Sequence, residues 1–198
     1  PAALSRRDFY RLINSVVVPR PIAWVSSRSP DGVDNLAPHS FFTGACVEPP
    51  VLQFTSVGRK DSLRNVEATG EFVINLAPEP LFEQINASAT DFPSDGDEFA
   101  EVGLEREPSL RVAPPRVAAS PVALECVLRD TVSLGDSTVV FGEVVHAAID
   151  EESLVDGHPE IGRLRPLARL GGNEWATIGE VRRIDRIRHR DWPGHYEG

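Results

Sequence analysis

The segment "PVALECVLRDTVSLGDSTVVFGEVVHAAID", residues 121–150, decides the fold class. It contains two long runs of β-forming residues that meet at Gly135 and Asp136, a pair typical of a tight turn. In the first run, a set of apolar residues occupies every second position, as expected for a strand with one buried face. The alternating set is Val122, Leu124, Cys126 and Leu128. The segment therefore predicts a long β-hairpin.

Three further segments predict strands. They are "PIAWVSSRSPDG" (21–32), which leaves through a tight turn, "PPVLQFTSV" (49–57) and "EFVINLA" (71–77). Strand and helix patterns do not alternate as in a βαβ protein, and no G-x-G-x-x-G follows a strand, so a Rossmann fold is not expected. The sequence predicts a mainly β, antiparallel barrel or sandwich, formed as one domain over residues 1–198.

Few segments have helical patterns. Ser5 and Asp8 form a cap for a helix that ends before Pro19, and Phe9, Leu12, Ile13 and Val16 share one face of it. "DSLRNVEATG" (61–70) predicts a short helix capped by Asp61, and "PLFEQINASA" (80–89) predicts another. Residues 90–120 predict a long loop. In 177–188 the apolar residues are spaced by three, which fits neither a helix nor a strand, and both stay open.

Composition limits the function. The chain has 198 residues, 41% of them hydrophobic, and a formal net charge of −10. Such a charge repels nucleic acid, although a small anion responds to the local field. No apolar run approaches the roughly 18 residues of a membrane span. Two cysteines, Cys46 and Cys126, make no disulfide framework, so we expect a cytoplasmic protein. The histidine spacings predict no metal site.

The segment "SVGRKDSLRN" (56–65) is a candidate anion site. Arg59, Lys60 and nearby hydroxyl groups precede a helix, where free backbone N–H groups and the helix dipole favour a phosphate. Arg59 could bind it with two hydrogen bonds, and Lys60 as a point charge. The alternative is a charged loop with both basic side chains in water, and the local sequence leaves that alternative open.

Two other segments carry weaker signals. "DNLAPHSFFTGACVEPP" (34–50) combines small and polar residues that would let a flat ligand approach the backbone. Cys46 there is interpreted as a buried small residue. "RPLARLGGNEWATIG" (165–179) contains a glycine pair and Trp175, which a core position would also explain. The arginine-rich tail is interpreted as a solvated face, although it could also contact a phosphate or a partner subunit.

In combination and in order, these segments resemble the flavin reductase-like family of FMN-binding split barrels. The resemblance is carried by "RPIAWVSSRSPDGVDNLAPHSFF" (20–42), "PPVLQFTSVGRKDSLRNVEATGEFVINLA" (49–77) and "RPLARLGG" (165–172). It implies a six-stranded antiparallel Greek-key split barrel with a few flanking helices, a homodimer, and FMN at or near the subunit interface. Residues 90–120 and the tail carry little of it.

By position, the resemblance implies three groups of site residues. The isoalloxazine ring would lie along Asn35, Leu36, Ala37, Pro38, His39 and Ser40, largely on backbone groups, with Ser26 and Ser27 near the same ring. The phosphate would be held by Ser56, Arg59, Lys60 and Ser62, with Asn65 close by. The nicotinamide side would be shaped by Arg169, Gly171, Gly172 and Trp175. Trp175 and His39 depart from the family's more usual residues at these places.

The implied activity is NAD(P)H-dependent reduction of FMN, with reduced flavin passed to a partner monooxygenase. Flavin carries the redox chemistry, and no catalytic acid or base of the protein is needed. Two other hypotheses remain open. The protein could retain its FMN and reduce another acceptor, or it could be a flavin-binding protein without activity.

Overall fold

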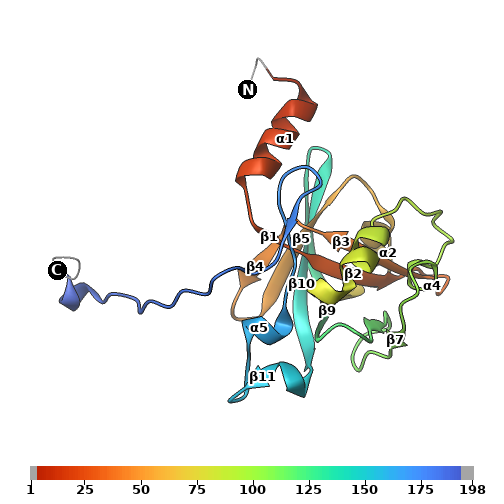
Figure 1. The fold of residues 1–198 in the computed structure, drawn as a ribbon. Coiled ribbons are helices and arrows are strands. Elements are labelled where there is room, and N and C mark those ends of the chain that lie inside the picture. Colours follow the sequence, from red (N-terminus) through yellow and green to blue (C-terminus); the bar gives the residue numbers. More distant parts are fainter. Residues whose placement is uncertain (1–3, 193–198) are drawn as a thin grey trace.

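A computed structural model describes residues 4–192, and its centre is one curved antiparallel sheet (Figure 1). The sheet has seven strands in the order β3-β2-β6-β9-β10-β5-β4. The strands are β2 (Ala23–Arg28), β3 (Asp34–His39), β4 (Phe42–Cys46), β5 (Val51–Val57), β6 (Glu71–Leu76), β9 (Val122–Leu134) and β10 (Ser137–Ile149). The predicted mainly β, antiparallel architecture is confirmed.

The sheet closes into a barrel because one stretch of chain forms both of its edges. β3 pairs with β2 and β4 pairs with β5, yet only Ser40 and Phe41 separate β3 from β4. The Phe41 carbonyl accepts a 2.9 Å hydrogen bond from the Thr55 amide, which holds this corner against β5. Counted as one bent strand, β3 and β4 give a barrel of six strands. β5 lies beside β10 although β6 follows it in sequence, which is a Greek-key arrangement.

The predicted hairpin is β9 and β10, which pair from Val122 opposite Ile149 to Leu134 opposite Ser137. Gly135 turns the chain with φ 63°. Gly142 lies at a register shift in β10, and a Cβ there would overlap the ring of Phe72. The barrel interior is filled by apolar side chains that include Val25, Phe54, Leu63, Phe72, Cys126 and Val140.

Helix α1 (Arg6–Val16) begins at the predicted cap, since Ser5 Oγ accepts a 3.2 Å hydrogen bond from the Asp8 amide. It stands away from the barrel (Figure 1). Its apolar face is left uncovered by the rest of residues 4–192: Phe9, Leu12, Ile13 and Val16 are between 37% and 64% exposed.

Helix α2 (Asp61–Thr69) lies where a short helix was expected, and Gly70 ends it with φ 75°. The prediction that Asp61 caps this helix is wrong. Lys60 occupies the cap position, without a side-chain hydrogen bond to the first turn. Asp61 is the first helical residue, and its carboxylate pairs with Arg64 one turn later.

The segment after β6 is ordered by buried polar groups. It contains η1 (Glu79–Leu81), α3 (Phe82–Ala87), α4 (Glu98–Glu101), β7 (Arg106–Glu107) and β8 (Arg116–Val117). Asn75 Oδ1 accepts a 2.9 Å hydrogen bond from the Val117 amide. The Glu125 carboxylate accepts hydrogen bonds of 2.9 Å from the Leu110 amide and 2.6 Å from the Arg111 amide. The region expected to be a long loop is therefore tied firmly to the barrel.

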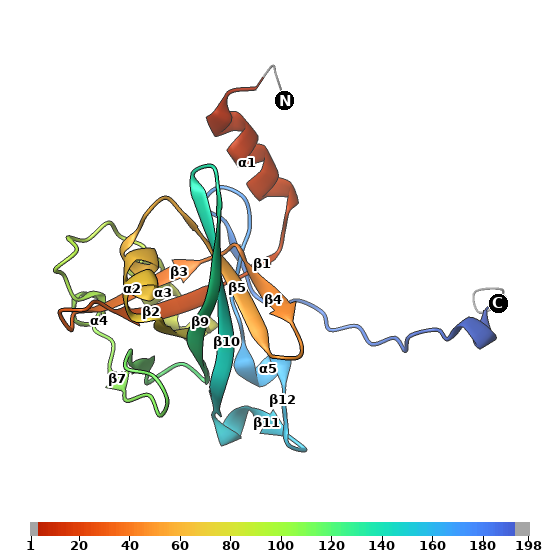
Figure 2. The same cartoon turned by 180° about the vertical axis from the view of Figure 1, so that it is seen from behind.

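The last quarter of the chain forms small elements. They are η2 (Glu151–Ser153), β11 (Leu154–Val155), β12 (His158–Pro159), α5 (Ile161–Leu164), β13 (Ala168–Arg169) and β14 (Trp175–Ala176). β13 and β14 form a small sheet with β1 (Arg20–Pro21), which precedes the barrel strands. Residues 177–188 are neither helix nor strand, and η3 (His189–Asp191) follows. Figure 2 shows this segment running away from the barrel. Over residues 4–192, no helix is long and apolar enough to cross a membrane.

Candidate functional site

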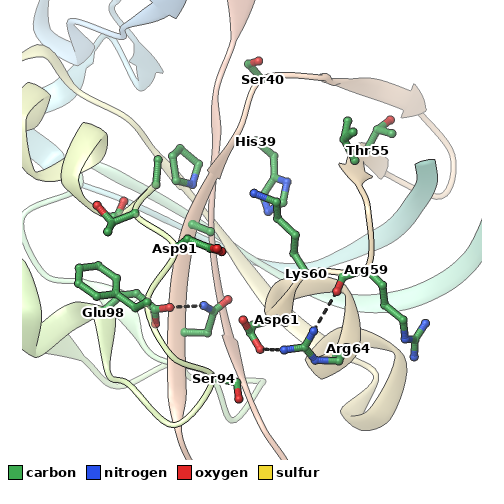
Figure 3. Close-up of a pocket in the computed structure, with 18 of the residues that line it drawn as sticks. His39, Ser40, Thr55, Arg59, Lys60, Asp61, Arg64, Asp91, Ser94 and Glu98 are labelled. Carbon is green, nitrogen blue, oxygen red and sulfur yellow. Dashed lines mark hydrogen bonds and ion pairs between the residues drawn. The ribbon is translucent and has the colours of Figure 1, made fainter. Parts of the chain in front are cut away.

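A cavity of about 440 Å³ lies between β3, the start of α2 and the loop that leads into α4 (Figure 3). Seven of the predicted site residues line it: Asn35, Ala37, Pro38, His39, Ser40, Arg59 and Lys60. The structure thus brings together two candidate segments of the sequence, 34–50 and 56–65, at one cavity.

β3 forms one wall of the cavity, and its side chains alternate between the two faces of the strand. Asn35, Ala37 and His39 lie on the same side of the strand, as every second residue does. Leu36 lies on the other side, fully buried in a cluster with Trp24 and Phe99. Leu36 can therefore contribute only backbone groups to this wall.

Several predicted residues support the wall from behind and do not line the cavity. Ser27, Ser62 and Asn65 are buried; Ser27 and Ser62 are hydrogen-bonded to Asn35, and Asn65 is hydrogen-bonded to Ser27. Asn35 Oδ1 accepts hydrogen bonds from Ser62 Oγ at 3.0 Å and Ser27 Oγ at 3.3 Å, and Asn65 Nδ2 donates to Ser27 Oγ at 3.2 Å.

Two more predicted serines satisfy backbone carbonyls elsewhere. Ser26 Oγ donates to the Pro115 carbonyl at 2.5 Å, which ties β2 to the segment before β8. Ser56 Oγ donates to the Gly58 carbonyl at 2.8 Å and so shapes the turn that leads to Arg59. Neither hydroxyl lines the cavity.

Glu98, which the sequence reasoning did not single out, lines the cavity and fixes Asn35 from the opposite side. Its carboxylate accepts a 2.7 Å hydrogen bond from Asn35 Nδ2 and a 3.3 Å hydrogen bond from the Leu36 amide. Glu98 is 6% exposed, and burial raises the pKa of its carboxyl. Both polar atoms of the Asn35 side chain are thus occupied by protein groups.

His39 is buried in the same wall and packs on Phe54, with 4.7 Å between ring centroids. Its Nε2 lies 3.2 Å from Ser62 Oγ. Burial, with the nearby Lys60 charge as a second cause, lowers the pKa of His39 to about 4. The imidazole is therefore neutral near pH 7.

The start of α2 gives the cavity a basic end. In Figure 3 the Lys60 side chain extends toward His39, whereas Arg59 points away. Arg59 pairs with Glu67 at 2.6 Å, and Arg64 pairs with Asp61 and donates to the Arg59 carbonyl at 2.8 Å. Among residues 4–192, Lys60 forms no ion pair. Its ammonium group and the first amides of α2 are therefore available to an anion.

The predicted nicotinamide residues lie outside this cavity, around β13 and β14. The Arg169 guanidinium stacks 4.5 Å from the Trp175 ring centroid and donates to the Gly172 carbonyl at 2.8 Å. Trp175 packs edge-on against Phe82, at 5.2 Å. Gly171 lies against α1, since a Cβ there would be 2.7 Å from Ser15 Oγ.

Arg20 connects this region to the cavity corner. Its buried guanidinium donates to the Leu170 carbonyl at 2.7 Å and to Ser40 Oγ at 3.4 Å. It also donates to the carbonyls of Asn14 at 2.6 Å and Val17 at 2.8 Å, close to the end of α1. One cation therefore holds three segments together beside the cavity.

Other cavity residues were missed by the sequence reasoning. They are Tyr10, Phe41, Thr55, Val57, Asp61, Arg64, Ser88, Ala89, Thr90, Asp91, Phe92 and Ser94. Arg64, one turn after Asp61 in an expected helix, carried a usable signal. The loop from Ser88 to Ser94 carried none, because it is placed by contacts at its two ends. Trp24 Nε1 donates to Ser88 Oγ at 2.9 Å, and Glu98 binds β3.

The sequence and the fold both match known proteins. The model of the flavin reductase-like domain family matches residues 15–164. An uncharacterized protein of Halalkalibacterium halodurans is 37% identical, with 94% of each chain covered. Nitrilotriacetate monooxygenase component B from Bacillus cereus is 30% identical, with a TM-score of 0.90 over 93% of this chain and 96% of that one. The 2-nitrobenzoate 2-nitroreductase NbaA from Pseudomonas fluorescens is 29% identical, with a TM-score of 0.89 over 98% and 97%.

Proposed function

The chain belongs to the flavin reductase-like family, and from this premise we propose that it is an NAD(P)H-dependent flavin oxidoreductase that binds FMN in the cavity. The observation that supports this most strongly is Lys60, which has no ion pair among the described residues, beside the uncapped start of α2 at one end of a cavity walled by β3. The volume of about 440 Å³ falls in the range of about 300–1,000 Å³ usual for ligand pockets.

The basic end suits the phosphate of FMN. Lys60 offers a point charge, and the first-turn amides of α2 offer hydrogen bonds that no side-chain cap uses. Ser62 Oγ already donates to Asn35, so we assign that serine to the wall and only its amide to the phosphate end. Arg59 would first have to leave Glu67, which makes it the secondary partner.

The β3 wall suits the flat ring of the flavin. Ala37 and Pro38 are small or compact, so a ring could approach the backbone closely. Asn35 is held by Glu98, Ser27 and Ser62, which fixes the wall before a ligand arrives. FMN would supply the redox chemistry, accepting hydride from the nicotinamide. The chain's residues bind and orient the ring, and neutral His39 adds no charge beside it.

We propose that the nicotinamide binds beside the predicted residues around β13. Arg169, Gly171, Gly172 and Trp175 lie outside the cavity, and Arg20 links them to Ser40 at its corner. A partner monooxygenase that uses the reduced flavin is supported by the likeness to the B. cereus component B.

A homodimer is part of the same proposal. Its support within the molecule is α1, whose apolar face is left open although the helix is ordered. A second copy would cover this face and lie close to the cavity, since Tyr10 of α1 lines it. We treat residues 1–198 as one domain, and the free cysteines Cys46 and Cys126 are compatible with a cytoplasmic protein. Cys46 is exposed, so the expectation that it is buried is wrong.

One observation favours a second candidate. The likeness to the nitroreductase NbaA supports a flavoprotein that keeps its FMN and reduces a small organic acceptor. The third candidate is a flavin-binding protein without enzymatic activity.

Steady-state oxidation of NADH and NADPH separates these functions. We expect turnover with at least one nicotinamide that rises with added FMN. Turnover of the purified yellow protein without added flavin, dependent on a nitroaromatic acceptor, would favour the second candidate. A protein that binds FMN and oxidises neither nicotinamide would leave only the third.

A further inference from the structure

Over residues 4–192, the C-terminal segment 177–191 has no hydrogen bond or ion pair with the barrel. Within the described part of the chain, its hydrogen bonds and ion pairs are local, such as Arg182 with Glu180 and Arg190 with Asp191. Both whole-molecule views show it projecting from the barrel after β14 (Figures 1 and 2). An extended segment that is left in water has no reason to be apolar.

The segment nevertheless has a regular apolar pattern. Ile178, Val181, Ile184 and Ile187 are spaced by three. The first three are 46%, 48% and 78% exposed. An extended chain near polyproline II geometry has about three residues per turn, so such a spacing places the apolar side chains in one line. Arg188, at the end of the segment, has φ −84° and ψ 148°, which belongs to this geometry. The spacing that fits neither a helix nor a strand therefore fits an extended arm with one apolar edge.

The charge of the arm is opposite to that of the rest of the chain. Residues 177–192 contain five arginines and three acidic residues, a net charge of +2, which leaves −12 for the remainder of the chain. The apolar edge needs a surface, and the arginines beside it favour an acidic one. The rest of another copy of this chain offers such a surface.

We propose that residues 177–192 form an arm that packs across a second copy of this chain, with Ile178, Val181, Ile184 and Ile187 against it and the arginines toward its acidic groups. The proposal rests on the proposed homodimer and adds that this segment holds the two subunits together. At about 3.1 Å per residue, the twelve residues 177–188 span about 37 Å, enough to reach across most of a subunit of this size.

Hydrogen exchange of the arm at a series of protein concentrations tests the proposal with the full chain. We expect the amides of 177–188 to be protected above the concentration at which the dimer forms, and to exchange freely below it. Protection at every concentration would mean that the arm folds on its own subunit, and free exchange within a dimer would mean that the arm serves another protein. Either result overturns the proposal. A wild-type protein that stays monomeric in the ultracentrifuge would instead overturn the proposed dimer, and the arm with it.

Three variants separate the apolar edge from the charge. Val181→Ser with Ile184→Ser should raise the dimer dissociation constant about tenfold or more, without changing the charge. Arg183→Gln with Arg186→Gln should raise it more at low salt than at high salt. The matched control, Glu180→Gln with Asp185→Asn, lies off the apolar edge and should not raise it. An unchanged constant for the serine variant, with its thermal unfolding midpoint also unchanged, contradicts the proposal.

Discussion

Glu98 accepts a 2.7 Å hydrogen bond from Asn35, across 63 positions of sequence, and so fixes a strand of the barrel to the start of α4 beside the cavity. The same carboxylate accepts from the Leu36 amide at 3.3 Å. Asn35 is thereby oriented with its oxygen toward Ser27 and Ser62. The wall proposed for the flavin ring is built before any ligand binds, which lowers the ordering cost of binding.

The first prediction concerns Glu98→Gln. The two hydrogen bonds go to different carboxylate oxygens, and glutamine replaces one of these oxygens with an NH2 group that only donates, so either Asn35 or the Leu36 amide loses its acceptor. We expect the FMN dissociation constant to rise about tenfold, equivalent to about 1.4 kcal/mol, by fluorescence titration.

The sign of that change is informative because Glu98 is also an anion beside an anionic ligand. If its charge were its only effect, Glu98→Gln would tighten FMN binding. Asp91→Asn is the control, since Asp91 lines the cavity, is exposed and has no hydrogen bond or ion pair in the described chain. It should leave the constant unchanged or lower it.

The second prediction separates the two basic residues at the start of α2. Lys60→Ala should raise the FMN dissociation constant about tenfold or more, because a charged hydrogen bond to the phosphate contributes about 1.5–3 kcal/mol. Arg59→Ala should have a smaller effect, since Arg59 already pairs with Glu67. Riboflavin lacks the phosphate, so its binding should be equal in wild type and both variants. An equal loss of affinity for riboflavin and for FMN would mean that Lys60 does not contact the phosphate.

The third prediction is a pH dependence of stability from His39. Its pKa is lowered from 6.5 to about 4 in the folded protein, so the unfolded chain binds the proton more readily. The stabilisation by neutral His39 is fully present above pH 6.5 and is lost as the pH falls toward 4. Over this window we expect the free energy of unfolding to fall by about 3 kcal/mol more in wild type than in His39→Gln. If the free energies of unfolding of the two proteins, measured with urea, change equally with pH across this range, His39 does not titrate as described.

The fourth prediction tests the barrel packing. Gly142→Ala would place a Cβ into the Phe72 ring, and overpacking of this kind costs about 1–3 kcal/mol. Gly44→Ala in β4 is the matched control, because nothing lies within 4 Å of its added Cβ and its φ is not in the left-handed region. Denaturant unfolding should show a lower midpoint for the first variant alone.

The alternating strands of the hairpin and the turn and cap residues make the barrel predictable from the sequence, because these signals are local. The arrangement of the cavity is less predictable. Glu98 lies in a stretch of acidic and polar residues that looks solvated, and only its tertiary contact with Asn35 makes it part of the site. Arg59 and Lys60 are neighbours in sequence, and only the tertiary structure shows that Arg59 pairs with Glu67 whereas Lys60 extends toward His39. The spacing of three in the tail is uninterpretable until the chain is found extended there.

The proposed function requires that FMN bound to this chain takes hydride from a reduced nicotinamide. Anaerobic rapid mixing of the FMN-loaded protein with NADH, and separately with NADPH, tests it most directly. We expect the visible absorbance of the flavin to be bleached with at least one of them, far faster than that of free FMN at the same concentration. Bleaching no faster than that of free FMN with both nicotinamides would contradict it.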